Sequence, residues 1–143
     1  MATKKRLSEE SNLASKPATM TWYAAHIIVS IRTIERQKGP ILVYENVILV
    51  EASDGEQAWI KARAHAKASM VKDDSLTLNG EPAAEALVGI RKIIEVSNRW
   101  PLSQSGDRPL DGTEITYSQF EVKDERALSK LANGEETLIR YLE

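Results

Sequence analysis

Residues 22–35, WYAAHIIVSIRTIE, and residues 41–52, ILVYENVILVEA, are the stretches that decide the fold. Both are rich in β-branched and aromatic side chains, and neither contains glycine or proline. Such composition is typical of β-strands. The turn-forming residues 37–40, QKGP, stand between them. The two stretches therefore predict a β-hairpin that a four-residue loop connects.

One face of this hairpin is expected to be apolar. Every second residue of 23–31 is apolar, and almost every second residue of 42–52 is apolar as well. Since side chains alternate between the two faces of a strand, each strand has one face suited to a core. Placing both apolar faces on the same side of the sheet allows only every second register.

Two pairs of opposite charge favour one of these registers. It places Arg32 opposite Glu45 and His26 opposite Glu51, and it leaves residues 37–40 as the loop. Cross-strand pairs of this kind contribute roughly 0.2–1 kcal/mol each. We therefore expect this pairing of the two strands.

The residues after the hairpin predict the main helix. Ser53, followed three residues later by Glu56, is a capping box that would start a helix. We expect this helix to run to about residue 70. At 100° per residue its small and apolar side chains share one face, and they are Ala58, Trp59, Ala62, Ala66 and Met70.

The rest of the chain predicts four more strands and a short helix. The strands are expected at 76–78, 84–97, 113–122 and 137–142, and the helix follows Asp124 and ends near Ala132. The predicted order is β-β-α-β-β-β-α-β, an α+β fold whose mostly antiparallel sheet carries the main helix on one face. Within 84–97 one side is expected to hold Ala86, Val88, Ile90, Ile94 and Val96.

The composition is that of one soluble domain preceded by a tail. The chain has 143 residues, of which 42% are apolar and 28% are charged, as in ordinary globular domains. Residues 1–20 are rich in serine, lysine and alanine and contain no aromatic residue. They would bury too little apolar surface to offset the entropy of ordering them. We expect a disordered, basic, polar tail at 1–20 and a single α+β domain at 21–143.

Charge is distributed unevenly along the chain. The net charge is −2 overall, +2 for residues 1–20, zero for 21–106 and −4 for 107–143. Because nucleic-acid binders usually carry a basic excess, we expect no such role for the folded part. No apolar stretch reaches the roughly 18 residues of a membrane span, and none follows the basic N-terminus as in a secretory signal. We therefore expect no membrane association and a cytoplasmic location.

Several short motifs carry a resemblance to a known family. They are Trp22-Tyr23-Ala24, Glu45-Asn46, Leu49-Val50-Glu51-Ala52, Asp54-x-Glu56-x-Ala58-Trp59 with Ala62, Gly89-Ile90, and Asp111-Gly112-Thr113-Glu114 before Tyr117. With these motifs, residues 21–143 resemble a bacterial family known as domain of unknown function 4288. The resemblance implies a compact bacterial domain. It implies no activity and no catalytic residues, because the family has no assigned chemistry.

The residue types give little support to catalysis. The chain contains no cysteine, which excludes disulfides, thiolate nucleophiles and cysteine-ligated metals. Its two histidines lie outside any nucleophile-elbow motif, and no glycine-rich phosphate loop occurs. Asp107, Asp111 and Glu114 come nearest to a metal cluster but lack the spacing of a calcium loop. We therefore expect no catalytic residues, no metal and no cofactor.

The second face of the hairpin is the surface most suited to a partner. It carries more aliphatic and aromatic side chains than a sheet face open to water should. Either the second helix or the C-terminal strand covers it, or a partner does, since tryptophan and arginine are enriched in interfaces. A second, weaker apolar stripe on the main helix, which includes Ile60, points away from the predicted core. The candidate partner-binding residues are Trp22, His26, Arg32, Glu45, Glu51 and Ile60.

These observations predict a non-catalytic protein-interaction module of a bacterial cytoplasm. Its partner would be an unidentified protein that it neutralises or scaffolds, or further copies of the chain. The first alternative is a small-ligand-binding protein or an enzyme with a polar pocket on the sheet, for which His26, Glu114 and Tyr117 are the candidate groups. The second alternative is weak nucleic-acid binding through the basic tail, with an affinity that falls steeply with salt.

Overall fold

A computed structural model describes residues 20–36, 39–70, 75–97 and 108–143. The expected tail lies outside these residues except for Met20, and so does part of the predicted hairpin loop. The element order is β-β-α-β-β-β-α-β, which confirms the expected α+β class. The main antiparallel sheet has the order β2-β1-β4-β3 and consists of β1 (Thr21–Thr33), β2 (Leu42–Ala52), β3 (Thr77–Leu78) and β4 (Glu81–Val96).

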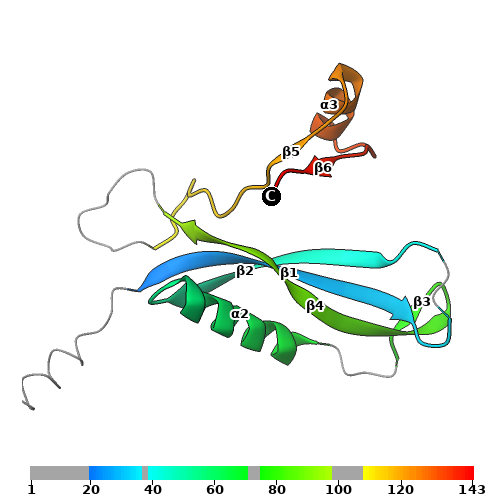
Figure 1. Ribbon diagram of the computed structural model, residues 1–143, viewed down its shortest axis with the longest axis horizontal. Helices are drawn as coiled ribbons and strands as arrows, with labels where there is room; N and C mark the ends of the chain where they lie inside the picture. Colours follow the sequence, from blue (N-terminus) through cyan, green and yellow to red (C-terminus); the bar gives the residue numbers. More distant parts are fainter. Residues whose placement is uncertain (1–19, 37–38, 71–74, 98–107) are drawn as a thin grey trace, which may run out of the picture.

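Helix α2 (Gly55–Ser69) covers one face of this sheet, which we call the inner face (Figure 1). Its buried residues are small, so that the helix axis can approach the strands closely. Trp59, expected on the buried side, is 44% exposed instead. The core formed between helix and sheet contains Ala25, Ile27, Val29, Val50, Ala52, Ala58, Ala62 and Ala66.

The C-terminal residues lie on the other side of the sheet, the outer face (Figure 1). Strands β5 (Phe120–Glu121) and β6 (Arg140–Tyr141) pair with each other. Helix α3 (Glu125–Ala132) lies between them in the sequence. The rings of Phe120 and Tyr141 meet edge to face, with centroids 5.8 Å apart. Of the strand predicted for 113–122, only β5 is formed, and residues 113–119 belong to no strand.

The register of β1 and β2 differs from the expected one. Ile28 lies opposite Glu45 and Trp22 opposite Glu51, so the predicted pairs of Arg32 with Glu45 and His26 with Glu51 are wrong. Each glutamate is displaced by four residues relative to β1. Because this displacement is an even number, every side chain keeps its predicted face. The alternation of apolar residues therefore predicts correctly which face of the sheet each side chain occupies. The two charge pairs, in contrast, do not predict the register of the strands.

The alternation along β4 is interrupted twice. Its register against β1 shifts between His26 and Ile27 and again between Ile28 and Val29. Each shift leaves one residue of β4 without an opposite residue, as in a β-bulge, and these residues are Arg91 and Val88. The predicted common side of 84–97 is therefore wrong. Ile90 packs on the core with Leu87 and Ile93, while Ile94 and Val96 lie opposite Ala24 and Trp22 on the outer face.

Local signals explain where the helices begin. The N-cap of α2 is Asp54, whose carboxylate accepts a hydrogen bond from the Gln57 N–H at 2.8 Å. The capping box predicted on Ser53 is therefore wrong by one position, because aspartate is an equally good cap and stands one residue later. Asp124 caps α3 in the same way through the Ala127 N–H, as the sequence predicts.

Candidate functional site

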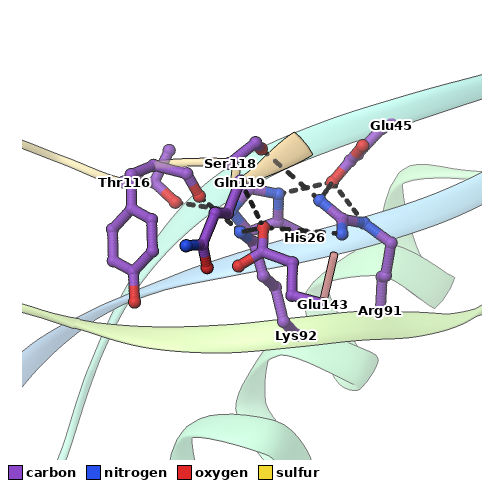
Figure 2. A network of polar contacts seen from close by, with 9 residues as sticks. His26, Glu45, Arg91, Lys92, Thr116, Ser118, Gln119 and Glu143 are labelled. Atoms are coloured by element: carbon purple, nitrogen blue, oxygen red, sulfur yellow. Dashed lines mark hydrogen bonds and ion pairs between the residues drawn. The ribbon is translucent and has the colours of Figure 1, made fainter. Parts of the chain in front are cut away.

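A cluster of polar side chains lies at the centre of the outer face. Strand β1 places His26 there, with only 2% of the residue exposed. Its Nδ1 lies 2.5 Å from Oε1 of Glu45 on β2, and its Nε2 lies 2.5 Å from Oγ1 of Thr116 (Figure 2). Because Thr116 lies in residues 108–143, which we call the C-terminal part, His26 connects this part of the chain to the sheet.

The bulge of β4 at Arg91 places two cations in this cluster, Arg91 itself and the neighbouring Lys92. Arg91 donates from Nε and Nη2 to Oε1 of Glu45, at 2.9 and 2.7 Å (Figure 2). Burial raises the pKa of Glu45, but the hydrogen bonds from Arg91 and His26 together outweigh it and leave this pKa below 4.5. Glu45 is therefore ionised at neutral pH and compensates the charge of Arg91.

Lys92, next to Arg91, contacts the C-terminal part directly. Its ammonium group donates to the Tyr117 carbonyl and to the Glu143 carboxylate (Figure 2). The Gln119 N–H donates to the same carboxylate at 3.1 Å. The hydrogen bond from Lys92 lowers the pKa of Glu143 below its ordinary 4.5. We call this cluster the polar clamp, and its members are His26, Glu45, Arg91, Lys92, Thr116 and Glu143.

Within the clamp, the Thr116 hydroxyl, the His26 imidazole and the Glu45 carboxylate contact one another in that order, as the groups of a hydrolase catalytic triad do. Such a triad also needs room for a substrate beside the hydroxyl and donors for an oxyanion. In the described part of the chain, both ring nitrogens of His26 contact other side chains, and the residue is almost fully buried. As it stands, the arrangement holds residues 113–119 and Glu143 against the sheet.

The three groups predicted for a polar pocket lie in different environments. His26 belongs to the polar clamp, whereas Glu114 is exposed. Tyr117 is 53% exposed, and its ring centroid lies 5.0 Å from Nζ of Lys92. Among the described residues no hydrogen bond joins any two of the three. A pocket that contains all of them stays a prediction.

The six partner-binding candidates do not share one surface. His26 and Glu45 are engaged in the polar clamp. Trp22 is partly buried on the outer face, opposite Val96 on one side and Glu51 on the other. Arg32 is exposed near the end of β1, and Ile60 is 49% exposed on α2, at the inner side of the sheet.

The edge of β2 that faces away from β1 is a second candidate surface, which was not predicted from the sequence, and no other strand among the described residues pairs with it. β2 pairs with β1 along its whole length and is the last strand of the sheet on that side. Large apolar side chains project from both of its faces, each between 39% and 51% exposed: Leu42, Val43, Tyr44, Val47 and Leu49.

The sequence contained a signal for this edge. Natural edge strands are usually protected by lysine, by proline or by a bulge. Residues 42–52, LVYENVILVEA, contain neither residue type, and the β1–β2 pairing has no register shift. What the sequence did not reveal is that β1 is the only strand paired with β2 among the described residues, whereas β4 pairs with β1 and, at Glu81 and Pro82, with β3.

An apolar groove runs beside this edge on the inner face. Its volume is about 480 Å³, and it lies between β1, β2 and the second half of α2. No residue of β4 lines it, so it opens toward the β2 side of the sheet. Its wall includes Ile27, Ile48, Ala66 and Met70, with Asn46, His65 and Ser69 as polar groups.

The described residues contain neither a group of metal-ligating side chains nor a membrane-spanning helix. In ranges 20–36, 39–70, 75–97 and 108–143, no three of the histidine, aspartate and glutamate side chains are grouped as metal ligands would be. Asp107, one of the three carboxylates singled out in the sequence, lies outside these ranges. No helix within the same ranges is both long and apolar enough to cross a membrane.

Comparison with known proteins identifies a family. The family model described as a domain of unknown function (DUF4288) matches residues 22–107. This is more than half of the chain, which therefore belongs to that family, as its motifs suggested. The match includes β1 to β4, α2 and the groove, while the motif at 111–117 and the C-terminal members of the polar clamp lie beyond it. No curated protein and no solved structure matches the chain.

Proposed function

We propose that this member of the DUF4288 family is a non-catalytic protein-interaction module that binds by adding a strand of its partner to β2. The observation that carries the proposal is the unprotected edge of β2, an 11-residue strand with five large, exposed apolar side chains. Long apolar edges of this kind pair readily with other chains. The proposal includes the expected bacterial cytoplasm as the place of action.

Strand addition suits both features of this surface. The unpaired N–H and C=O groups along an edge supply hydrogen bonds to any extended segment, and pockets for alternate side chains supply specificity. The groove between β2 and α2 is apolar and lies beside Ile48, so it would receive side chains on the inner face of the added strand. The edge and the groove together form one binding surface.

The polar clamp supports the proposal from the other side of the sheet. It engages the outer face at its centre through β1, β2 and β4, with the C-terminal part of the chain as the covering element. Its contacts are made by side chains that point away from the inner face. In the described part of the chain, Val43, Val47 and Leu49 of β2 remain 40–51% exposed beside the clamp.

The test compares two lysine substitutions. Val43→Lys places a charge on the β2 edge, at a side chain that is 51% exposed, and Leu138→Lys places the same charge on a residue that is 91% exposed in the C-terminal part. We expect the immobilised wild type and Leu138→Lys to retain the same protein, or further copies of the chain, from an extract of the source cell, and Val43→Lys to lose it. Circular dichroism confirms that the variants are folded.

Two outcomes would overturn the proposal. One is retention of the same protein by Val43→Lys at the wild-type level, which would place the interface elsewhere. The other is a wild type that retains nothing and is monomeric by light scattering at all accessible concentrations.

A further inference from the structure

We infer that the strand added to β2 is β2 of a second copy, so that two molecules share one continuous antiparallel sheet. The inference rests on the proposed strand addition and names its partner. A twofold axis perpendicular to the sheet relates the copies, and the same patch is used on each. Both α2 helices then lie on one side of the shared sheet, and both C-terminal parts lie on the other.

The sequence of β2 is complementary to itself when its direction is reversed. With the axis at Asn46, Tyr44 of one copy lies opposite Ile48 of the other, and Val43 lies opposite Leu49. Aromatic and β-branched cross-strand neighbours are favourable pairs. The pairing also keeps odd-numbered residues opposite odd-numbered residues, so each side chain remains on the face that it occupies in the single chain.

Charge on the strand is compatible with this pairing. The charged residues of β2 are Glu45 and Glu51. Glu45 is compensated inside its own chain by Arg91, and it would lie opposite Val47 of the second copy. Glu51 would lie near the far end of the pair. No two like charges are directly opposite, and β2 carries no cation that would select an acidic partner.

The groove provides a specific binding site for a side chain of the second copy. Tyr44 is half exposed and projects on the inner face, two residues from Asn46 at the groove. In the proposed pair it stands opposite Ile48, which lines the groove of the other copy. The ring can enter against Ala66 and Met70, with its hydroxyl toward His65 or Ser69. By symmetry each copy fills the groove of its partner.

The chain contains no cysteine, so a single engineered thiol reports directly on the axis. In the full chain, Asn46→Cys would bring two thiols together across the axis, where opposite Cα atoms of antiparallel strands are about 4.5–5.5 Å apart. This distance lies within disulfide range. Val43→Cys is the matched control, because it is exposed on the same strand but lies opposite Leu49. We expect Asn46→Cys to form a covalent dimer on mild oxidation and Val43→Cys to form none at that rate.

Light scattering on the unmodified chain gives the independent readout. We expect a mass twice that of one chain, and we expect Tyr44→Lys to raise the dissociation constant at least about tenfold. A monomeric wild type overturns the inference, and so does a dimer that Tyr44→Lys leaves unchanged or that Val43→Cys crosslinks as readily. If the wild type is monomeric but retains another protein through the β2 edge, the inference fails while the proposed function stands.

Discussion

Glu45 is the residue on which the polar clamp depends. One of its oxygens accepts hydrogen bonds from Arg91 and lies 2.5 Å from His26. Its side chain is 23% exposed, so these charge-assisted bonds are only partly screened by water. Loss of the carboxylate charge would leave Arg91 beside a neutral group on a largely covered face.

The lowered pKa of Glu45 predicts acid sensitivity. A carboxyl whose folded-state pKa is below its unfolded value of about 4.5 stabilises the protein fully above that pH. This contribution is lost as the pH falls through the folded pKa. We expect the free energy of unfolding, from urea denaturation, to decrease as the pH falls below about 4.5.

The variant Glu45→Gln isolates this group. It should be less stable than the wild type by about 1–3 kcal/mol at neutral pH, because the charged acceptor of Arg91 is lost. Its unfolding free energy should also decrease less in acid. Glu35→Gln, on an exposed residue beyond β1, is the control. Equal pH dependence of Glu45→Gln and the wild type would mean that another carboxyl causes the acid sensitivity.

Only part of this cluster could be predicted from the sequence. The alternation of apolar residues placed His26 and Glu45 on one face correctly. The partner that compensates Glu45, however, is Arg91, which is 46 residues away and reaches this face at a bulge. A repeating pattern does not indicate which residue a bulge leaves unpaired, so Arg91 and Lys92 were missed.

At the scale of single elements, the start of α2 offers a direct test. Asp54→Ala removes the acceptor of the Gln57 N–H and should destabilise the protein by about 0.5–2 kcal/mol. Ser53→Ala should have little effect, because Asp54 and not Ser53 caps the helix. Thermal unfolding followed by circular dichroism measures both. A larger loss of stability for Ser53→Ala than for Asp54→Ala would show that Ser53 caps the helix, as the sequence suggested.

The elements were predicted with unequal success for a physical reason. β1, β2, α2 and α3 carry local signals, namely runs of β-branched residues and aspartate caps, and all four were expected near their observed bounds. Residues 113–119 also alternate but form no strand, because their contacts with the sheet are made by side chains such as Thr116. Strand formation requires a neighbouring backbone, and the sequence of the segment does not specify one.

At the scale of the whole molecule, the polar clamp joins two parts of the chain. The sheet with α2 lies within the family match, and residues 108–143 lie on the side of its outer face, where α3 projects away from the sheet (Figure 1). The two parts meet through His26, Arg91 and Lys92 on the sheet side. A contact formed mainly by polar side chains is sensitive to single substitutions, because each lost partner leaves another group unsatisfied.

Arg91→Met therefore should release the C-terminal part without unfolding the sheet. The substitution removes the contacts of Arg91 with residues 108–143, which are the weak contact with Ser118, the ion pair with Glu143 at 3.7 Å and the cation–π contact with Tyr141, whose ring centroid lies 4.4 Å from the guanidinium carbon. The bonds to Glu45, which lie within the sheet, are lost as well. Amide hydrogen exchange measured by NMR should become at least about tenfold faster at Gln119 and its neighbours in 113–119, as a loss of roughly 1.5–3 kcal/mol implies.

Exchange within β1 should change far less in this variant, because the core between the sheet and α2 is intact. Arg63→Met is the matched control, since Arg63 lies over the Trp59 ring at 5.6 Å on α2, away from the outer face. It should leave the Gln119 amide unchanged. Faster exchange in β1 and at Gln119 to the same extent would show that the two parts unfold as one unit, and the clamp would then be a component of the global fold rather than a separable contact.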